Sequence, residues 1–290
     1  MEILTKIYNL ANATATAPTS FGSFHLTFVA IIILLTTLVS MTFKNCSERA
    51  VNRLTAFVWV VILILEIYKQ LVFSIHLTDG AFSWDYAWYS FPFQFCSSPL
   101  YILPIIAFTK NQRLRDCCIA YMMTFSLFAG LAVFCYPNDV FCEWTGINYQ
   151  TMIHHGSQIL MGVFYAVRYR RRMNVRFFFG GVFVFIVMVL IAMVLNVSVH
   201  HYFSLHGIGD TFNMFYISPY FPCTLPLLSI VWEKLPYIPF ACLYFFGFIL
   251  CAAIVYSVER GLTKSARRSA IARTCKRLAR ENDCIFYYNM

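Results

Sequence analysis

Seven stretches of this chain are long and apolar enough to cross a lipid bilayer, and they constrain the fold more than any other feature of the sequence. A transmembrane helix needs roughly 20 mostly apolar residues. Of the 290 residues, 60% are apolar and only 12% are charged, which leaves no soluble domain of useful size. The sequence therefore predicts an all-α membrane protein, a seven-transmembrane-helix bundle. The predicted spans are residues 24–43, 55–77, 89–109, 117–135, 149–167, 177–198 and 236–257.

The lysines and arginines orient these spans. Nineteen of the 22 follow the first, third, fifth or seventh span, whereas the alternate segments hold only Lys6 and Lys234, and Lys69 lies within the second span. Basic residues mark the cytoplasmic side of a membrane protein. The N-terminus is therefore predicted outside the cytoplasm and the C-terminus in the cytoplasm. The predicted regions are a non-cytoplasmic tail at 1–22, a transmembrane domain at 23–258 and a basic cytoplasmic tail at 259–290.

The net charge of +9 does not predict a nucleic-acid partner, because it arises from this orientation signal. Basic residues beside spans contact anionic lipid headgroups, so we expect membrane lipids as partners and a multi-pass location in the cell membrane. The eleven cysteines show no CxxC pair and no Cys/His metal spacing, and neither a metal nor a cofactor is predicted. The sequence leaves open the oligomeric state and a disulfide among Cys135, Cys142 and Cys223.

A few ionisable residues lie inside the predicted spans, where they are costly and usually face the interior or a cavity. Glu66, Lys69 and Gln70 in the second span share one helix face, because they are three and four residues apart. They predict either an internal ion pair that fixes helix packing or part of a polar site. Both interpretations stay open.

Cys96 in the third span and His155 in the fifth are predicted to lie at similar depth. Both spans run inward, and each residue lies about two turns, or ~10 Å, below the start of its span. A histidine can take a thiol proton, and the thiolate can then attack an acyl carbonyl. The simpler alternative is that Cys96 is an inert packing residue, as buried cysteines often are.

Polar neighbours extend this candidate pair. Gln94, Gln158 or Asn196 could orient the imidazole or donate to an oxyanion. His154 and His155 point about 100° apart on a helix, so we expect at most one of them to face a given partner.

Four short strings carry a resemblance to a known family over about residues 55–260. They are residues 65–70, residues 93–100 with Cys96 after Phe-Gln-Phe, the His-His-Gly-Ser string at 154–157, and Asn196 followed by residues 213–216 and Pro219. In this order the chain resembles the YwaF-like integral membrane proteins and their eukaryotic acyltransferase relatives, which remodel ether phospholipids.

The resemblance implies a membrane-embedded acyltransferase or acyl hydrolase that acts on lipids through a cysteine nucleophile and a histidine base. Cys96 would carry the acyl group, and His155 would be the base, with His154 as the alternative. The predicted catalytic residues are Cys96, His155 and Asn196; the predicted substrate-binding or supporting residues are Glu66, Lys69, Gln70, Gln94, His154 and Asn213. Neither the acyl donor nor the acceptor is identified.

Two other functions fit the same topology. A polytopic transporter or channel would use Glu66, Lys69 and His155 as a polar pathway, but the inner halves of the spans are apolar and no internal repeat is evident. A retinal Schiff base in the last span is excluded because residues 236–257 contain no lysine, and nothing specific predicts a receptor. The connection at 199–235 is long for a simple loop and predicts a lid or a re-entrant cap.

Overall fold

Five helices of the structure are long and apolar enough to cross a membrane. The computed structural model describes residues 2–288, with side chains described to Ser265, and it is all-helical apart from one small hairpin. The five are Ser23–Phe43 (α2), Glu48–Ser74 (α3), Gln112–Cys135, Val175–His206 (α8) and the Tyr237–Ser265 part of α10. Each contains most of one predicted span, so the prediction of a helical multi-span membrane protein is confirmed.

The remaining elements are shorter or more polar. Helix α1 spans Glu2–Ala11, and a hairpin of β1 (Ile75–Thr78) and β2 (Ala81–Trp84) follows α3. The helix Gln112–Cys135 is divided into α5 (Gln112–Tyr121), a π-helical turn (Met122–Ser126) and α6 (Leu127–Cys135). The other helices are α4 (Pro99–Phe108), α7 (Thr145–Arg168) and α9 (Leu228–Lys234). The whole of α10 spans Tyr237–Tyr288. Residues 259–288 of the predicted tail at 259–290 continue α10, and the tail's side chains beyond residue 265 lie outside the described residues.

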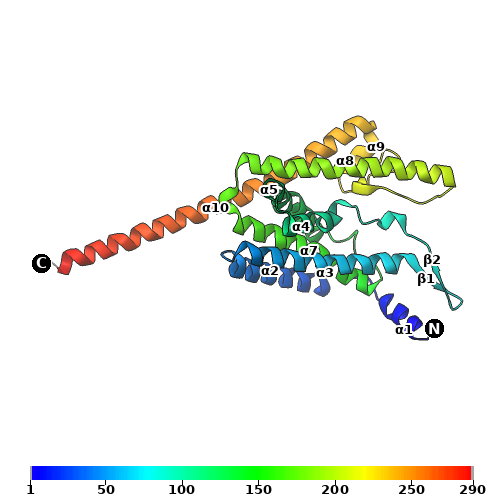
Figure 1. Ribbon diagram of the computed structural model, residues 1–290, viewed down its shortest axis with the longest axis horizontal. Helices are drawn as coiled ribbons and strands as arrows, with labels where there is room; N and C mark the ends of the chain where they lie inside the picture. Colours follow the sequence, from blue (N-terminus) through cyan, green and yellow to red (C-terminus); the bar gives the residue numbers. More distant parts are fainter. Residues whose placement is uncertain (1, 289–290) are drawn as a thin grey trace.

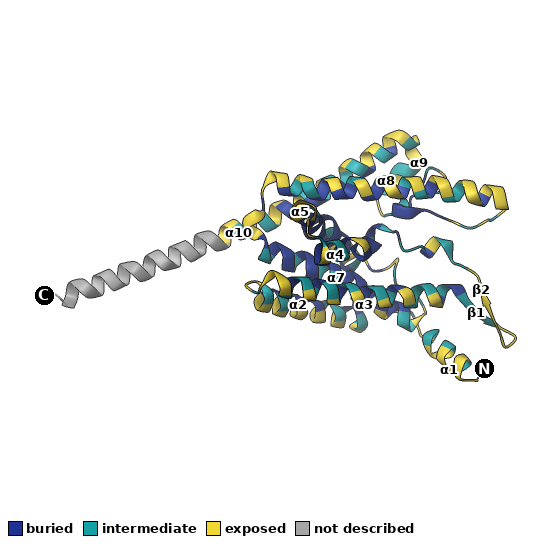
Figure 2. Cartoon of the chain, in the orientation of Figure 1, coloured by how far each residue is buried: buried dark blue, intermediate teal, exposed yellow. Residues whose placement is uncertain are grey.

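Helix α7 occupies the middle of the bundle. It packs against α2, α3 and α6, while α5 packs against α8, so that α2 and α3 lie on one side of it and α8 and α10 on the other (Figure 1). Figure 2 shows buried residues concentrated on α7 and α5 and exposed residues along α2 and α8. The predicted span at 149–167 is thus a helix of 24 residues that neighbours shield, which allows it to carry buried Asn148, Gln150, His154, His155 and Gln158.

The predicted span at 89–109 differs most from the structure, because only Pro99–Phe108 is α-helical, a length of about 15 Å. Before it the chain makes two 3-10 turns, Trp88–Ser90 and Phe95–Ser97. Phe91, ahead of Pro92, has φ −47° and ψ 134° and so avoids the helical region, which is disfavoured before proline. Pro99 starts α4, where its missing N–H costs nothing. The expectation that Cys96 lies two turns inside a continuous helix is wrong: it lies in a 3-10 turn just before α4.

Helix α4 is joined to α3 by an unusual hydrogen bond. Pro104 lies inside α4 and cannot donate to the carbonyl of Leu100, four residues earlier. The indole N–H of Trp59 on α3 donates to that oxygen instead, at 3.0 Å. The proline therefore creates an acceptor that fixes the neighbouring helix.

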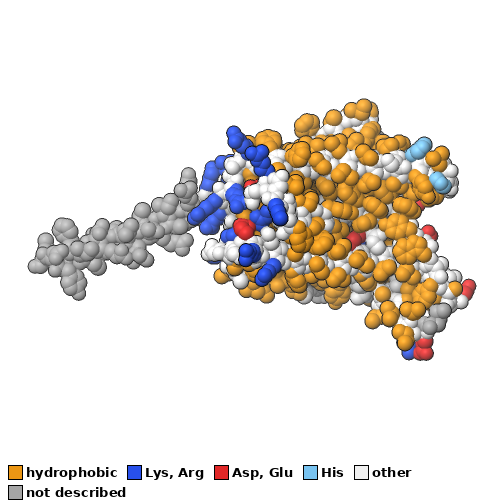
Figure 3. All heavy atoms as spheres, viewed as in Figure 1, with side chains coloured by type: hydrophobic (Ala, Val, Ile, Leu, Met, Phe, Trp, Pro, Cys, Tyr) orange, Lys and Arg blue, Asp and Glu red, His pale blue; other side chains and the backbone are white. Residues whose placement is uncertain are grey.

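One end of the bundle is strongly basic, and we call it the basic end: the connections α2–α3, α4–α5 and α7–α8. Figure 3 shows its Lys and Arg side chains beside a broad hydrophobic band, where α10 leaves the bundle. Glu48 lies at its centre, 2.9 Å from the guanidinium of Arg115 and 3.1 Å from that of Arg168. The hydroxyl of Tyr169 also donates to Glu48, at 2.8 Å. This carboxylate ties the ends of α3, α5 and α7 together.

The cysteines of residues 2–265 are all free, including Cys135, Cys142 and Cys223. No disulfide joins these three cysteines to one another within the described part of the chain.

Replacing Trp59 by Phe tests the Trp59–Leu100 bond. The variant leaves a buried carbonyl without a donor, so we expect the free energy of unfolding to fall by about 1–3 kcal/mol. The measurement is chemical unfolding in detergent followed by circular dichroism. Trp84→Phe is the control, because Trp84 is 60% exposed. Equal stability of the two variants would contradict the role of Trp59.

Candidate functional site

The candidate site is built around the 3-10 turn that holds Cys96. The carbonyl oxygen of Cys96 accepts hydrogen bonds from Nε2 of His154, at 2.9 Å, and from Nε2 of Gln158. These residues are four apart on α7 and therefore share a face. Backbone polar groups in a buried non-helical turn need protein partners, and α7 supplies them to the carbonyl of Cys96.

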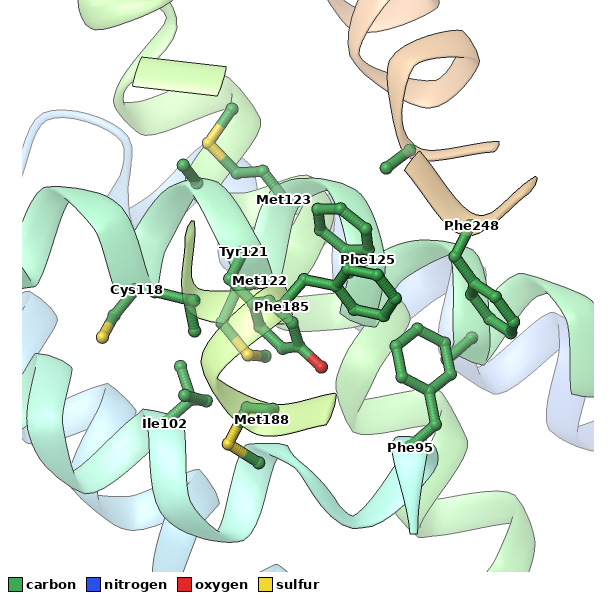
Figure 4. Close-up of a cluster of buried hydrophobic side chains, with 14 of the residues drawn as sticks. Phe95, Ile102, Cys118, Tyr121, Met122, Met123, Phe125, Phe185, Met188 and Phe248 are labelled. Carbon is green, nitrogen blue, oxygen red and sulfur yellow. The ribbon is translucent and has the colours of Figure 1, made fainter. Parts of the chain in front are cut away.

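Phe95 holds the same turn from its other side. Its ring lies 4.8 Å from that of Phe248 on α10, centroid to centroid. Figure 4 shows the ring pointing into the aromatic cluster where Phe125 and Phe185 stack at 4.5 Å. The Cys96 turn is thus fixed by a polar contact to α7 and an apolar contact to α5–α6, α8 and α10.

Gln94 connects this turn to the connection between α8 and α9. Its Nε2 donates to the carbonyl of Asn213 at 3.0 Å, and its Oε1 accepts from the N–H of Phe215 at 2.9 Å. Asn196 binds Met214 in the same reciprocal way, at 3.0 and 2.7 Å. Asn213 donates to the Pro222 carbonyl at 3.0 Å and accepts from the Ser218 N–H at 2.9 Å. We call these three side chains, Gln94, Asn196 and Asn213, the amide clamp.

The clamped segment has an uncommon backbone. Phe215 and Tyr216 have φ of 58° and 54°, in the left-handed region that non-glycine residues rarely adopt. Residues 212–215 and 217–218 are buried, and the phenol of Tyr244 on α10 donates to the Phe215 carbonyl at 2.8 Å. Of the connection predicted as a lid or a re-entrant cap, residues 199–206 continue α8 and Leu228–Lys234 forms α9. Residues 212–218, which we call the cap, are a largely buried segment held by the amide clamp.

The hydrogen bonds define the protonation of both histidines. A carbonyl oxygen only accepts, so Nε2 of His154 carries the proton and, in the neutral ring, Nδ1 has the lone pair. That Nδ1 is buried and has no hydrogen-bond partner. His155 donates through Nδ1 to the carbonyl of Thr151 at 2.8 Å, which leaves Nε2 as its basic nitrogen. The two rings are neighbours, with centroids 5.5 Å apart.

Glu66, Lys69 and Gln70 form a connected group on α3. The ammonium of Lys69 lies 2.8 Å from Oε1 of Glu66, and Nε2 of Gln70 donates to the same oxygen at 2.7 Å. The predicted internal ion pair is therefore present. Lys69 also interacts electrostatically with Cys96, His154 and His155, and Oε2 of the buried Glu66 has no hydrogen-bond partner. The pair thus borders the site as well as fixing α3.

Two tyrosines that the sequence prediction did not include complete the surroundings. The hydroxyl of Tyr86 donates to Oε1 of Gln70 at 2.9 Å. Burial, with a smaller contribution from Cys96, raises the pKa of Tyr216 to about 12, so its hydroxyl keeps its proton at neutral pH. Tyr216 lies within one of the strings noted above; for Tyr86 the sequence offers no local signal, because its contact joins a loop to α3.

The predicted site residues therefore fall into two groups. Cys96, His154 and Gln158 are in direct contact, with His155, Lys69, Glu66 and Gln70 beside them. Gln94, Asn196 and Asn213 instead form the amide clamp, in which the Asn196 side chain binds the backbone of Met214. Within residues 2–265, no three His, Cys, Asp or Glu side chains gather closely enough to hold a metal ion.

Comparison with known proteins supports membership of a membrane family. The sequence pattern of the TMEM164 family matches residues 20–258, most of the chain. No curated protein and no solved structure matches. The chain belongs to the TMEM164 family, and the matched region contains every residue of the candidate site.

Gly130 on α6 allows the close approach of α7 at the site, and its replacement tests that packing. A β-carbon at Gly130 would lie 2.8 Å from the His155 carbonyl oxygen. We expect Gly130→Ala to push the helices apart and lower the free energy of unfolding by about 1–3 kcal/mol. Gly247→Ala is the control, because a β-carbon at Gly247 meets nothing within 4 Å. Chemical unfolding in detergent compares the two, and equal stability would refute tight packing at Gly130.

Proposed function

We propose that this member of the TMEM164 family is a membrane-embedded enzyme that transfers or hydrolyses lipid acyl chains through a thioester on Cys96. The observation that carries the proposal is the turn before α4, where α7 holds the Cys96 backbone through His154 and Gln158 beside a second histidine and a lysine. A thiol, basic nitrogens and a cation are the groups that acyl transfer through cysteine requires. The resemblance to YwaF-like proteins and their acyltransferase relatives supports the same chemistry.

The proposed reaction has two halves. The Cys96 thiol gives its proton to a histidine, and the sulfur attacks the carbonyl carbon of a lipid acyl ester or thioester. The bond to the donor breaks, and the departing oxygen or sulfur takes the proton from the imidazolium. The hydroxyl of an acceptor lipid, or water, then attacks the carbonyl carbon of the Cys96 thioester and gives its proton to the histidine. The carbon–sulfur bond breaks, the acyl group leaves on the acceptor oxygen, and the imidazolium returns the proton to the sulfur. The Lys69 ammonium stabilises negative charge in both halves, as nearby cations do.

We assign the two histidines different roles. His155 is the base, because Thr151 fixes its Nδ1 as the donor and leaves Nε2 basic. His154 is a positioning residue, because its Nε2 binds the carbonyl of Cys96. The amide clamp positions the turn through Gln94, two residues before Cys96.

We also infer seven membrane crossings, a non-cytoplasmic N-terminus, a cytoplasmic basic end and a location in the cell membrane. Helix α7 has 24 residues and a length of about 36 Å, enough to cross the hydrocarbon core. The short α4, together with the irregular segment before it, makes the other additional crossing. The basic residues at one end support the orientation.

Labelling with a lipid that carries an alkyne-tagged acyl chain tests the nucleophile. We expect a hydroxylamine-sensitive label on the wild type and none on Cys96→Ala, because only Cys96 forms the thioester. Cys118→Ala is the control, because Cys118 is buried with 1% exposure in the apolar cluster of Figure 4. Equal labelling of wild type and Cys96→Ala would refute the proposal.

Replacement of each histidine by glutamine separates the base from the positioning residue. Glutamine at 154 can still donate to the Cys96 carbonyl but cannot act as a base. We expect His154→Gln to keep acylation within about tenfold of wild type and His155→Gln to lose roughly 10²–10⁴-fold, the usual contribution of a general base. His154→Ala, which removes the donor, should fall well below His154→Gln. The initial rate of Cys96 labelling is the measurement, and the reverse order would assign the base to His154.

A further inference from the structure

An open hollow with polar and apolar walls lies at the basic end, between α2 and the end of α7. Its volume is about 350 Å³. Thr36, Ser40 and Lys44 line it from the α2 side, and Val163, Val167 and Arg170 line it from the α7 side. It shares no residue with the site around Cys96.

Two buried hydroxyl groups in this hollow have no hydrogen-bond partner. Thr36 and Ser40 are each 8% exposed, and neither Oγ1 of Thr36 nor Oγ of Ser40 has a partner. Hydroxyls in helices commonly bind the carbonyl four residues earlier, as Thr37 does to Ile33 at 2.8 Å. A buried polar group without a partner is unfavourable, so a polar ligand that reached these two hydroxyls would remove that cost.

The rim of the hollow carries two cations. Lys44 and Arg170 are exposed, and neither is part of the ion pairs among residues 2–265. The carboxylate of Glu48, at the same end of the bundle, is already paired with Arg115 and Arg168. The rim therefore has positive charge that suits an anion.

We propose that this hollow binds an anionic phospholipid. Its phosphate lies at Lys44 and Arg170, its glycerol ester or hydroxyl oxygens meet Ser40 and Thr36, and an acyl chain runs along Val163 and Val167. Thr36 and Ser40 lie on α2 and Lys44 caps its C-terminal end, at intervals of four residues. The hydroxyls of Ser40 and Thr36 therefore lie about 6 and 12 Å deeper than the lysine. A hollow that leads from a charged rim past hydroxyls to an apolar wall matches the order of groups in a phospholipid. This lipid is bound as a ligand, and its site is independent of the proposed acyl transfer.

A neighbouring hollow of about 550 Å³ provides an internal comparison. Arg49 and Arg53 give it two basic residues at the same end, but its walls include the rings of Phe43 and Phe57. Its serine, Ser47, is engaged as the cap of α3 and accepts from the Ala50 N–H at 3.3 Å. It has comparable charge without the unpartnered buried hydroxyls, so removing its arginines is the matched control.

The test is a titration of full-length protein in neutral detergent with dioleoylphosphatidylglycerol, followed by native mass spectrometry and thermal unfolding. We expect wild type and Arg49→Gln/Arg53→Gln to bind the first lipid with similar affinity. Lys44→Gln/Arg170→Gln should bind it at least about tenfold more weakly, and Thr36→Val/Ser40→Ala about threefold more weakly. Thermal unfolding without lipid checks that each variant is folded. If Lys44→Gln/Arg170→Gln is not folded, the lipid affinity of Thr36→Val/Ser40→Ala tests the proposal instead.

Two further titrations of the wild type identify the class of ligand. Phosphatidylcholine should bind the wild type at least tenfold more weakly than phosphatidylglycerol, and inorganic phosphate should give no thermal shift. Equal weakening in the two charge variants would show general attraction to the basic end and overturn the proposal. An equal shift with inorganic phosphate would also overturn it, in favour of a free phosphate site. Because Cys96 labelling is measured separately, failure of the lipid site leaves the proposed reaction tested on its own.

Discussion

The requirement that every backbone polar group inside a bilayer find a partner in the protein governs this structure. The chain leaves helical geometry before α4, and the Cys96 carbonyl is bound there by His154 and Gln158. Within α4, Pro104 creates a second such acceptor, which Trp59 satisfies. Donors on α7 thus serve the irregular segment, and a donor on α3 serves α4. The helix that presents Gln158 and both histidines must in turn be shielded from lipid, which accounts for the central position of α7.

The same requirement explains how much the sequence could predict. Long apolar helices need only local information, and five of the predicted spans correspond to helices able to cross a membrane. The ion pair of Glu66 and Lys69 was predictable because its spacing is local. The short length of α4 could not be predicted in this way. Proline positions indicate where a helix breaks, but not which side chains will bind the carbonyls that the break leaves without a backbone donor.

The sequence could predict which residues belong to the candidate site better than it could predict which groups they contact. Cys96 and the histidines stood out because polar residues are rare in apolar spans. The roles of Gln94, Asn196 and Asn213 depend on backbone groups of the connection between α8 and α9, which no spacing in the sequence reveals. Tyr244 offered one hint, since a buried tyrosine hydroxyl usually finds an acceptor, but the acceptor itself, the Phe215 carbonyl, is 29 residues away.

The left-handed backbone at Phe215 and Tyr216 has a mechanical consequence. Two adjacent residues in this region cost of order 1–3 kcal/mol each, and the amide clamp keeps them there. If the cap swings outward, that stored energy is released and favours the open form. Gln94 is bound to the cap through two hydrogen bonds and is two residues from Cys96. Opening the cap must therefore break both bonds or pull on the turn that carries the thiol. The ring of Phe95, next to Cys96, also lies 5.7 Å from the ring of Phe215, so movement of the cap would reach Cys96 through both side chains.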